Sequence, residues 1–211
     1  MAIWARMILA LLAGTLPATP VLAAKPSVDI ACSPLAAVPA LRDAEVTALS
    51  MQPEGGRCVV EVKAANDKAL LRQQQMLEVL TQHACAAPAE VSVDDARLSL
   101  QLRLPKHCAA RGSRDLFAGE GVAWKPARGV SPHYPPAAMQ QGLSGRSLLK
   151  ALIDAQGTVA AVIVETSSGH ALLDEAAVDE LRGWPFVRAE AESTVPELTI
   201  VRVPMRYALV E

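Results

Sequence analysis

The stretch that decides the fold is SSGHALLDEAAVDELRGWPF, residues 167–186. It begins with small residues typical of a loop, continues with helical periodicity, and ends at Gly183 and Pro185, two residue types that stop helices. Apolar side chains recur at helical spacing along one stripe: Leu173, Ala177, Leu181 and Trp184. The stretch has no activated nucleophile, phosphate-binding loop or metal-ligand cluster, so we predict that it is a scaffold element.

Strands are predicted on both sides of this helix. Upstream, GRSLLKALIDAQGTVAAVIVETSSG, residues 145–169, has the pattern of a hairpin that turns at DAQG, and Leu148 and Leu152 make both faces of its first strand apolar. Downstream, LTIVRVPMRYAL, residues 198–209, alternates most clearly. One face of this last strand carries Val201, Val203, Met205 and Tyr207, and the other carries Arg202 and Arg206.

A short helix, PPAAMQQG at residues 135–142, precedes the hairpin, and Gly142 can end it with a left-handed cap. The order in this half is therefore helix, strand, strand, helix, strand.

The preceding half, residues 24–110, has a similar order. An apolar stretch at 33–44 is expected to be helical, and residues 45–64 form a hairpin that turns at PEGG. Residues 68–84 form a helix capped by Asn66 or Asp67. Residues 90–105 are expected to form a strand or short hairpin with four leucines on one face, Leu98, Leu100, Leu102 and Leu104. The shared order raises the hypothesis of a diverged structural repeat.

Four cysteines, Cys32, Cys58, Cys85 and Cys108, all lie in this half. An even set in an exported chain favours two structural disulfides. If residues 94 and 95 form a turn, the chain returns to the end of the long helix, which favours Cys85 with Cys108 and leaves Cys32 with Cys58, one of three connectivities. A metal site that uses His83 and His107 has the wrong ligand spacing, so we predict no metal.

The chain ends and the linker differ in composition from the two halves. Residues 1–23 have an arginine, an apolar run, two prolines and small residues before Ala24, as in a cleaved signal peptide. Residues 111–130 are rich in Gly and Pro, as linkers are. We therefore predict a signal peptide at 1–23, a disulfide-containing α+β domain at 24–110, a linker at 111–130 and a second α+β domain at 131–211. The second domain is expected to have a small antiparallel sheet with helices packed on it.

The second domain resembles the C-terminal domain of the TonB energy-transducer family. The resemblance is carried by YPPAAMQQGLSG, by DAQGTVAAVIVETSSGHALLDEAAVDELRGWPF and by VRVPMRYAL. The matching positions are Tyr134, Pro135, Ala138, Gly142, Gly145, Gly157, Ser167, Ser168, Gly169, Leu173, Asp174, Ala176, Ala177, Trp184 and Phe186. Among them, the resemblance implies a structural role for Tyr134, Gly145, Gly157, Ser168, Gly169, Leu173, Ala177, Trp184 and Phe186.

In that family the last strand receives an extended peptide from an outer-membrane transporter, which is recognition by strand addition. Pro204 fits an edge strand, since a central strand needs every N–H. The resemblance thus implies a binding site in the last strand at Thr199, Ile200, Val201, Arg202, Val203, Met205, Arg206 and Tyr207. The partner is an outer-membrane transporter or another envelope protein of a Gram-negative cell, and the strand could also pair with a second copy of the chain.

The chain departs from typical transducers in two respects. Residues 1–24 contain no histidine, and a cysteine-bearing domain stands in place of the long proline-rich spacer. The sequence therefore favours a soluble periplasmic binding protein, with an energy transducer anchored by residues 1–24 as the alternative. A net charge of −2 provides no basic field for nucleic acid. No nucleophile and base pair or metal set is apparent, so we predict neither an enzyme nor a cofactor.

Overall fold

The computed structural model describes residues 32, 35, 37–105, 108, 124–127, 129–189 and 196–209. The predicted signal peptide, residues 1–23, lies outside these ranges, as does most of the predicted linker. Within them, no helix combines the length and the apolar character that crossing a membrane requires.

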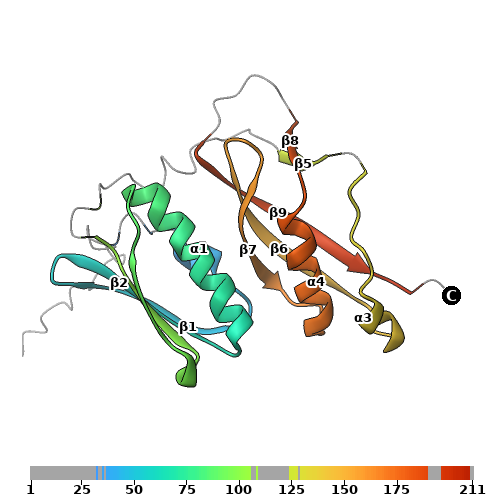
Figure 1. The fold of residues 1–211 in the computed structure, drawn as a ribbon, viewed down its shortest axis with the longest axis horizontal. Coiled ribbons are helices and arrows are strands. Elements are labelled where there is room, and N and C mark those ends of the chain that lie inside the picture. The colour runs from blue at the N-terminus through green and yellow to red at the C-terminus, as the bar shows by residue number, and fades with distance from the viewer. Residues whose placement is uncertain are drawn as a thin grey trace, which may run out of the picture.

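The N-terminal unit consists of a four-stranded antiparallel sheet and a long helix (Figure 1). Its elements are the 3-10 helix η2 (Val38–Leu41), β1 (Val46–Glu54), β2 (Arg57–Ala64), α1 (Asp67–Cys85), β3 (Glu90–Asp94), the 3-10 helix η3 (Asp95–Arg97) and β4 (Ser99–Arg103). The strand order is β1-β2-β4-β3.

Helix α1 begins as its sequence predicts. Asn66 is the N-cap, and its side chain accepts a hydrogen bond from the backbone N–H of Ala69, which satisfies one of the free donors of the first turn. Side chains at helical spacing form one buried face of the helix: Leu70, Gln73, Met76, Leu77, Leu80 and Ala84. These side chains pack against the alternating inward residues of β2 and β4.

Three local predictions in this unit need correction. In the stretch at 33–44, which was expected to be helical, η2 is a 3-10 helix of four residues and Arg42 after it is extended. The hairpin turns at Gly55 and Gly56, both with positive φ, whereas Pro53 and Glu54 belong to β1. Leu98 lies in the turn between η3 and β4 with φ of 47°, so only the three leucines after it line the buried face. The two glycines make a tighter turn than the four residues predicted, and the left-handed turn at Leu98 interrupts the alternation before β4.

The C-terminal unit contains a three-stranded antiparallel sheet of order β7-β6-β9. Its elements are β5 (Trp124–Pro126), α3 (Pro136–Gln140), β6 (Gly145–Asp154), β7 (Val159–Thr166), α4 (Ala171–Arg182), β8 (Phe186–Arg188) and β9 (Leu198–Tyr207). The predicted α+β class and the order helix, strand, strand, helix, strand are confirmed. The short ribbon of β5 with β8 was not predicted, and β5 comes from the expected linker. The limits of the two domains stay a prediction.

The two units do not repeat one topology. In the C-terminal unit the strand after the helix, β9, pairs with β6, the first strand of the hairpin. In the N-terminal unit the strand that joins the hairpin, β4, pairs with β2, its second strand. The hypothesis of a structural repeat is therefore not supported by the strand pairing.

Both faces of the C-terminal sheet are covered, but by different parts of the chain. One face packs against α4 in a core that contains Leu149, Val162, Leu173, Leu181 and Phe186, all from the C-terminal unit. On the other face, Leu152, Ile163 and Leu198 belong to the same core as Leu41 and Leu77 of the N-terminal unit. The two-sided cover expected for β6 is thus confirmed.

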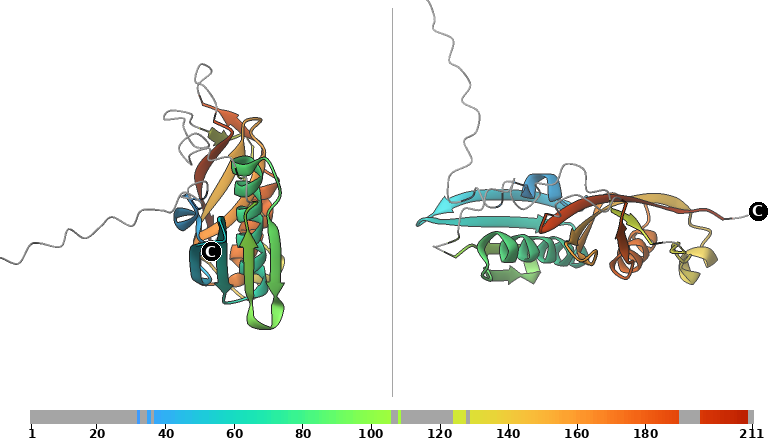
Figure 2. Two further views of the ribbon diagram at one scale, coloured as in Figure 1. Left: turned by 90° about the vertical axis from the view of Figure 1, so that its left-hand side faces the viewer. Right: turned by 90° about the horizontal axis from the view of Figure 1, so that it is seen from above.

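A buried carboxylate joins the two units. Asp43 is 1% exposed, and its side chain accepts hydrogen bonds from Arg72 Nε at 2.8 Å and from the backbone N–H of Val164 at 3.0 Å. The backbone N–H of Ala44 donates to Val164 O at 2.7 Å. Residues 43 and 44 therefore close the edge of β7 at this point. Helix α1 lies beside α4 in Figure 1 and in the right-hand view of Figure 2, and Arg182 of α4 donates to Gln75 of α1.

The contacts of Arg72 with Asp43 and Glu45 also change the pKa of Arg72. Burial alone would lower the pKa of Arg72, but its hydrogen bonds and charge interactions with Asp43 and Glu45 outweigh this effect and raise the pKa above its ordinary value. The guanidinium is thus a fully compensated buried charge.

We expect Asp43→Ala to lower the free energy of unfolding by about 3–5 kcal/mol, because it removes the buried carboxylate of Arg72 and leaves only the partly exposed Glu45 as its partner. Denaturant unfolding measures the loss. Asp94→Ala is the matched control, since its ion pair with Arg97 is exposed and is worth at most about 1 kcal/mol. Equal losses in the two variants would contradict the assignment.

Candidate functional site

The candidate binding site is the outer edge of β9. On one side β9 pairs with β6 along its whole length, from Gly145 opposite Tyr207 to Asp154 opposite Leu198. On its other side, no backbone hydrogen bond reaches it from any residue that the structure describes. A row of main-chain donors and acceptors is therefore open to an incoming strand.

The two faces of β9 differ in burial as its sequence predicts. Val203, Met205 and Tyr207 are at most 6% exposed and pack in the core beneath α4. On the opposite face Arg202, Pro204 and Arg206 are exposed. Three other predicted site residues serve packing as well, since Val201 contacts the core beneath α4, Ile200 contacts the core shared with the N-terminal unit, and Thr199 accepts a hydrogen bond from Trp124.

Pro204 indicates which backbone groups face outward. It stands opposite Leu148 and has no N–H to donate. Because the backbone groups of successive residues point to opposite sides of a strand, the ladder to β6 keeps all its donors only if Pro204 faces outward. The N–H groups of Ile200, Arg202 and Arg206 then also face the open edge.

Arg202 is held by neighbouring strands. Its Nε donates to Glu165 Oε2 on β7 at 2.9 Å, and Lys150 Nζ on β6 donates to Glu165 Oε1 at 2.8 Å and to Ala40 O at 2.7 Å. Burial by itself would raise the pKa of Glu165, but the hydrogen bonds from Lys150 and Arg202 outweigh it and hold that pKa below its ordinary value. The charge of Arg202 is thus compensated within the sheet.

A second carboxylate, Asp174, explains the Ser-Ser-Gly and Leu-Asp part of the motif. Ser147 Oγ on β6 donates to Asp174 Oδ1 at 2.5 Å, the N–H of Ser168 donates to the same oxygen at 2.8 Å, and Ser167 Oγ donates to Oδ2. The network ties the first turn of α4 to the sheet. At Gly145 an added Cβ would lie 2.9 Å from Ser168 Cβ, so this close approach requires glycine.

The far end of the hairpin is packed by aromatic residues. Gly157 has φ of 88°, and a Cβ there would overlap Phe186 O and approach Trp124 within 2.9 Å. Trp124 is 9% exposed, and its Nε1–H donates to Thr199 Oγ1 at 3.3 Å. Trp124 was not predicted to pack against this domain, because it lies in the expected linker. Trp184, the last residue of the predicted apolar stripe, is partly buried and packs against the core beneath α4.

The remaining predicted scaffold residues lie as follows. Leu173 and Ala177 are fully buried under the sheet, and Gly169 lies in the loop before α4 with φ of 90°. The ring of Tyr134 meets that of Tyr207 edge to face at 5.5 Å between centroids. Together these contacts support the end of β9 from below.

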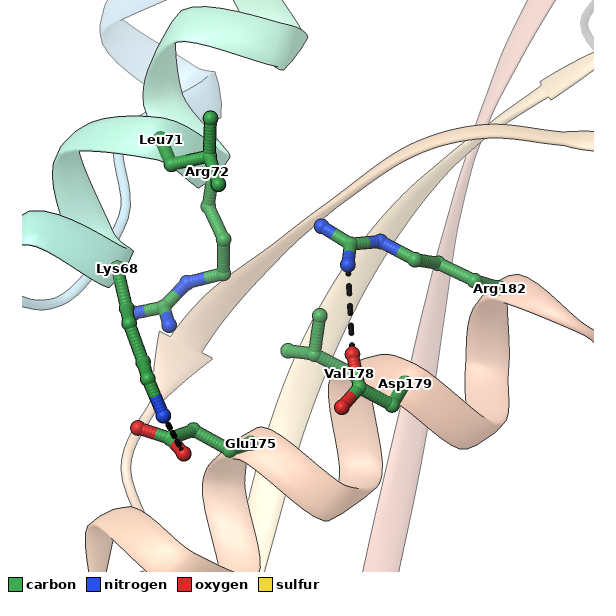
Figure 3. A pocket seen from close by; sticks show the side chains of 7 residues that line it. All are labelled: Lys68, Leu71, Arg72, Glu175, Val178, Asp179 and Arg182. Carbon is green, nitrogen blue, oxygen red and sulfur yellow. Dashed lines mark hydrogen bonds and ion pairs between the residues drawn. The ribbon is translucent and has the colours of Figure 1, made fainter.

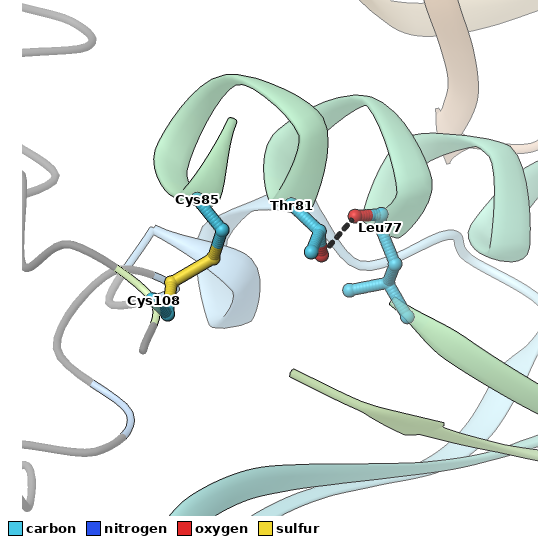
Figure 4. Close-up of a disulfide and its surroundings, with 4 residues drawn as sticks. All are labelled: Leu77, Thr81, Cys85 and Cys108. Atoms are coloured by element: carbon cyan, nitrogen blue, oxygen red, sulfur yellow. Dashed lines mark hydrogen bonds between the residues drawn. A yellow bond between two sulfur atoms is a disulfide. The ribbon is translucent and has the colours of Figure 1, made fainter. Parts of the chain in front are cut away.

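The disulfides lie at the other end of the molecule. Cys32 pairs with Cys58, and Cys85 pairs with Cys108, which is the connectivity that the turn argument favours. Figure 4 shows the second of these disulfides. Among the described residues, no group of three or more His, Cys, Asp or Glu could hold a metal ion.

A charged groove of about 200 Å³ between α1 and α4 is not a second site (Figure 3). Lys68 pairs with Glu175, while Arg182 donates to Gln75 at 2.7 Å and to Asp179 at 3.3 Å. These side chains link the two helices to each other, so the groove belongs to the joint between the units.

Comparison with known proteins agrees with the C-terminal motif. Residues 130–209 match the family model described as Gram-negative bacterial TonB protein C-terminal. The chain is 42% identical over 78 residues to the protein TonB of Xanthomonas campestris pv. campestris strain B100, which covers 37% of this chain and 34% of that protein. It is 38% identical over 73 residues to the protein tonB2 of Pseudomonas aeruginosa, which covers 35% of this chain and 26% of that protein.

A solution NMR structure of the Pseudomonas aeruginosa TonB C-terminal domain aligns with a TM-score of 0.36 and 20% identity, over 42% of this chain and 88% of that chain. The chain spans about a third of the length of the Xanthomonas relative and a smaller share of the Pseudomonas one. The resemblance to the TonB C-terminal domain is thereby confirmed for residues 130–209. This is a family of energy transducers and binding proteins and not of enzymes.

Tyr134 and Tyr207, whose rings meet at the end of β9, provide a matched test of the packing. The hydroxyl of Tyr134 donates to Leu143 O, whereas the buried hydroxyl of Tyr207 has no hydrogen-bond partner among the described residues. We expect Tyr134→Phe to lower the free energy of unfolding by about 1 kcal/mol, and Tyr207→Phe to leave it unchanged or raise it. Denaturant unfolding at neutral pH compares the two, and a clear loss in Tyr207→Phe would contradict the assignment.

The buried hydroxyl of Tyr207 also predicts a loss of stability at alkaline pH. Burial, with smaller contributions from Glu180 and Asp174, raises the pKa of Tyr207 to about 12 from the ordinary value of 10.0. The unfolded chain therefore loses this proton first, so the contribution is fully present below pH 10 and is lost as the pH rises towards 12. Tyr207→Phe should remove this part of the alkaline destabilisation.

Proposed function

We propose that this chain is a periplasmic protein-binding module whose C-terminal domain receives an extended segment of an outer-membrane transporter, or of another envelope protein, along the outer edge of β9. The observation that carries the proposal is the open edge of a ten-residue strand whose other edge and apolar face are both occupied. Such an edge can bind an extended peptide by strand addition.

The closure of β7 supports the choice of β9. Asp43 and Ala44 bond both backbone groups of Val164, so a strand that approached β7 at this point would meet occupied donors and acceptors. The N-terminal unit therefore directs an incoming strand to the opposite edge. This is a concrete role for a domain that the TonB C-terminal match does not cover.

Export and processing belong to the same proposal. We propose that residues 1–23 are removed and that the mature protein begins near Ala24, where its four cysteines pair in an oxidising compartment. N-terminal sequencing of protein purified from the periplasmic fraction should return that start. An intact Met1 in purified membranes would instead favour the anchored energy transducer.

The strand-addition mode makes a prediction that needs no change to the protein. The probe is a short synthetic peptide with the sequence of the periplasmic N-terminal segment of an outer-membrane transporter from the same organism. We expect its binding to shift the backbone amide signals of residues 199–207. Two further peptides are methylated at every second backbone nitrogen, one at the odd and one at the even positions. Only one of these sets of N–H groups faces β9, so only one peptide should bind more weakly. The loss should be about 3 kcal/mol, or roughly a hundredfold in Kd, because about three hydrogen bonds are lost.

Equal loss in both phases would show that the peptide does not bind as a strand. Shifts confined to residues 37–105 would place the site in the N-terminal unit. Dimerisation through β9 is a further outcome, and analytical ultracentrifugation without peptide would detect it.

A further inference from the structure

Two arginines without an acidic partner stand together where β9 ends. Arg146 on β6 and Arg206 on β9 are directly opposite each other in the antiparallel ladder, and both are exposed. Within the ranges that the structure describes, neither guanidinium makes an ion pair. Like charges directly opposite each other destabilise a sheet, so the pair is a local electrostatic liability.

The same face of the sheet treats its other arginine differently. Four residues earlier, Arg202 faces Lys150 across the ladder, and Glu165 bonds both of them. The pair of Lys150 and Arg202 therefore has a carboxylate partner within the sheet, whereas Arg146 and Arg206 have none among the described residues.

Arg146 and Arg206 border an open hollow of about 640 Å³. Beside the two arginines, its lining consists of Ser144, Gly145, Pro204, Tyr207 and Ala208. Among the described residues, the N-terminal unit contacts this face around Leu152 and Ile163 and at Lys150, whose Nζ donates to Ala40 O. A ligand side chain can thus reach the guanidinium groups from solvent.

Strand addition brings one ligand side chain to this place. Side chains of neighbouring strands that stand opposite each other share a face, so the peptide residue paired with Arg206 extends the row Arg146, Arg206 on the same face. We propose that the Arg146–Arg206 pair selects peptides with a carboxylate side chain at the position opposite Arg206. The inference rests on the proposed strand addition at β9 and specifies the chemistry of its partner.

Charge also argues against a second copy of this chain as the occupant. In an antiparallel self-pairing centred on Pro204, Arg206 of one copy would face Arg202 of the other. A pairing centred on Arg206 would oppose two uncompensated arginines. Both registers add repulsion, whereas an acidic peptide removes it.

The test is a double-mutant cycle between protein and peptide. Synthetic versions of the same transporter peptide carry Glu or Gln at each position in turn, and binding is measured by titration calorimetry at low and high salt. At one position we expect the Glu peptide to bind about fivefold more tightly than the Gln peptide, an advantage that decreases with salt. Arg206→Gln should remove this preference, Arg146→Gln should reduce it, and Arg206→Lys should largely restore it.

Arg97→Gln is the matched control, because it removes the same charge from an exposed arginine on the distant turn of the N-terminal unit. It should keep the preference. Equal affinity of Glu and Gln peptides at every position, with amide shifts still on β9, would overturn the selection and leave strand addition standing. A preference that survives in Arg206→Gln would also overturn it. Failure of every peptide to shift β9 would overturn both proposals.

Discussion

The buried carboxylate of Asp43 is the interaction on which the arrangement of the two units depends. It accepts hydrogen bonds from Arg72 on α1 and from the backbone of Val164 on β7, two elements from different halves of the chain. A buried ion pair usually adds little net stability over an apolar pair, but removing one partner is expensive. We therefore interpret this contact as one that specifies geometry, since the carboxylate that compensates Arg72 within the N-terminal unit also accepts the N–H of Val164 at the edge of β7.

That placement determines where a partner can bind. A three-stranded sheet has two edges, and the N-terminal unit bonds one of them at Val164. The other edge carries Pro204 and exposed arginines, features by which native edge strands avoid indiscriminate pairing. In the proposed strand addition, β9 would combine open main-chain groups with selection of the charge of the incoming strand. The disulfides lie in the N-terminal unit and contribute to the body that closes β7, not to the edge itself.

Much of this could be read from local pattern. Asn66 caps α1, Gly142 ends α3 with φ of 66°, and the alternation of Val203, Met205 and Tyr207 predicts which side of β9 is buried. The motif residues gain their reasons only in three dimensions. Asp174 is required because three donors from separate segments converge on it, and Gly157 because Phe186 and Trp124 approach its backbone. Trp124 was missed, since a single aromatic residue in a Gly-rich and Pro-rich stretch has no periodicity.

The sequence by itself determined the two long helices, the hairpins, the edge character of β9 and the family of the C-terminal domain, because caps, turns and hydrophobic periods act over a few residues. Only the tertiary structure decided which strand joins each hairpin, which edge is closed and which arginine has a counterion. Those outcomes depend on contacts such as that of Val164 with Asp43, 121 positions apart. A charged residue carries no local signal that says whether such a distant partner will reach it, so Arg202 and Arg206 look alike in sequence and differ in the fold.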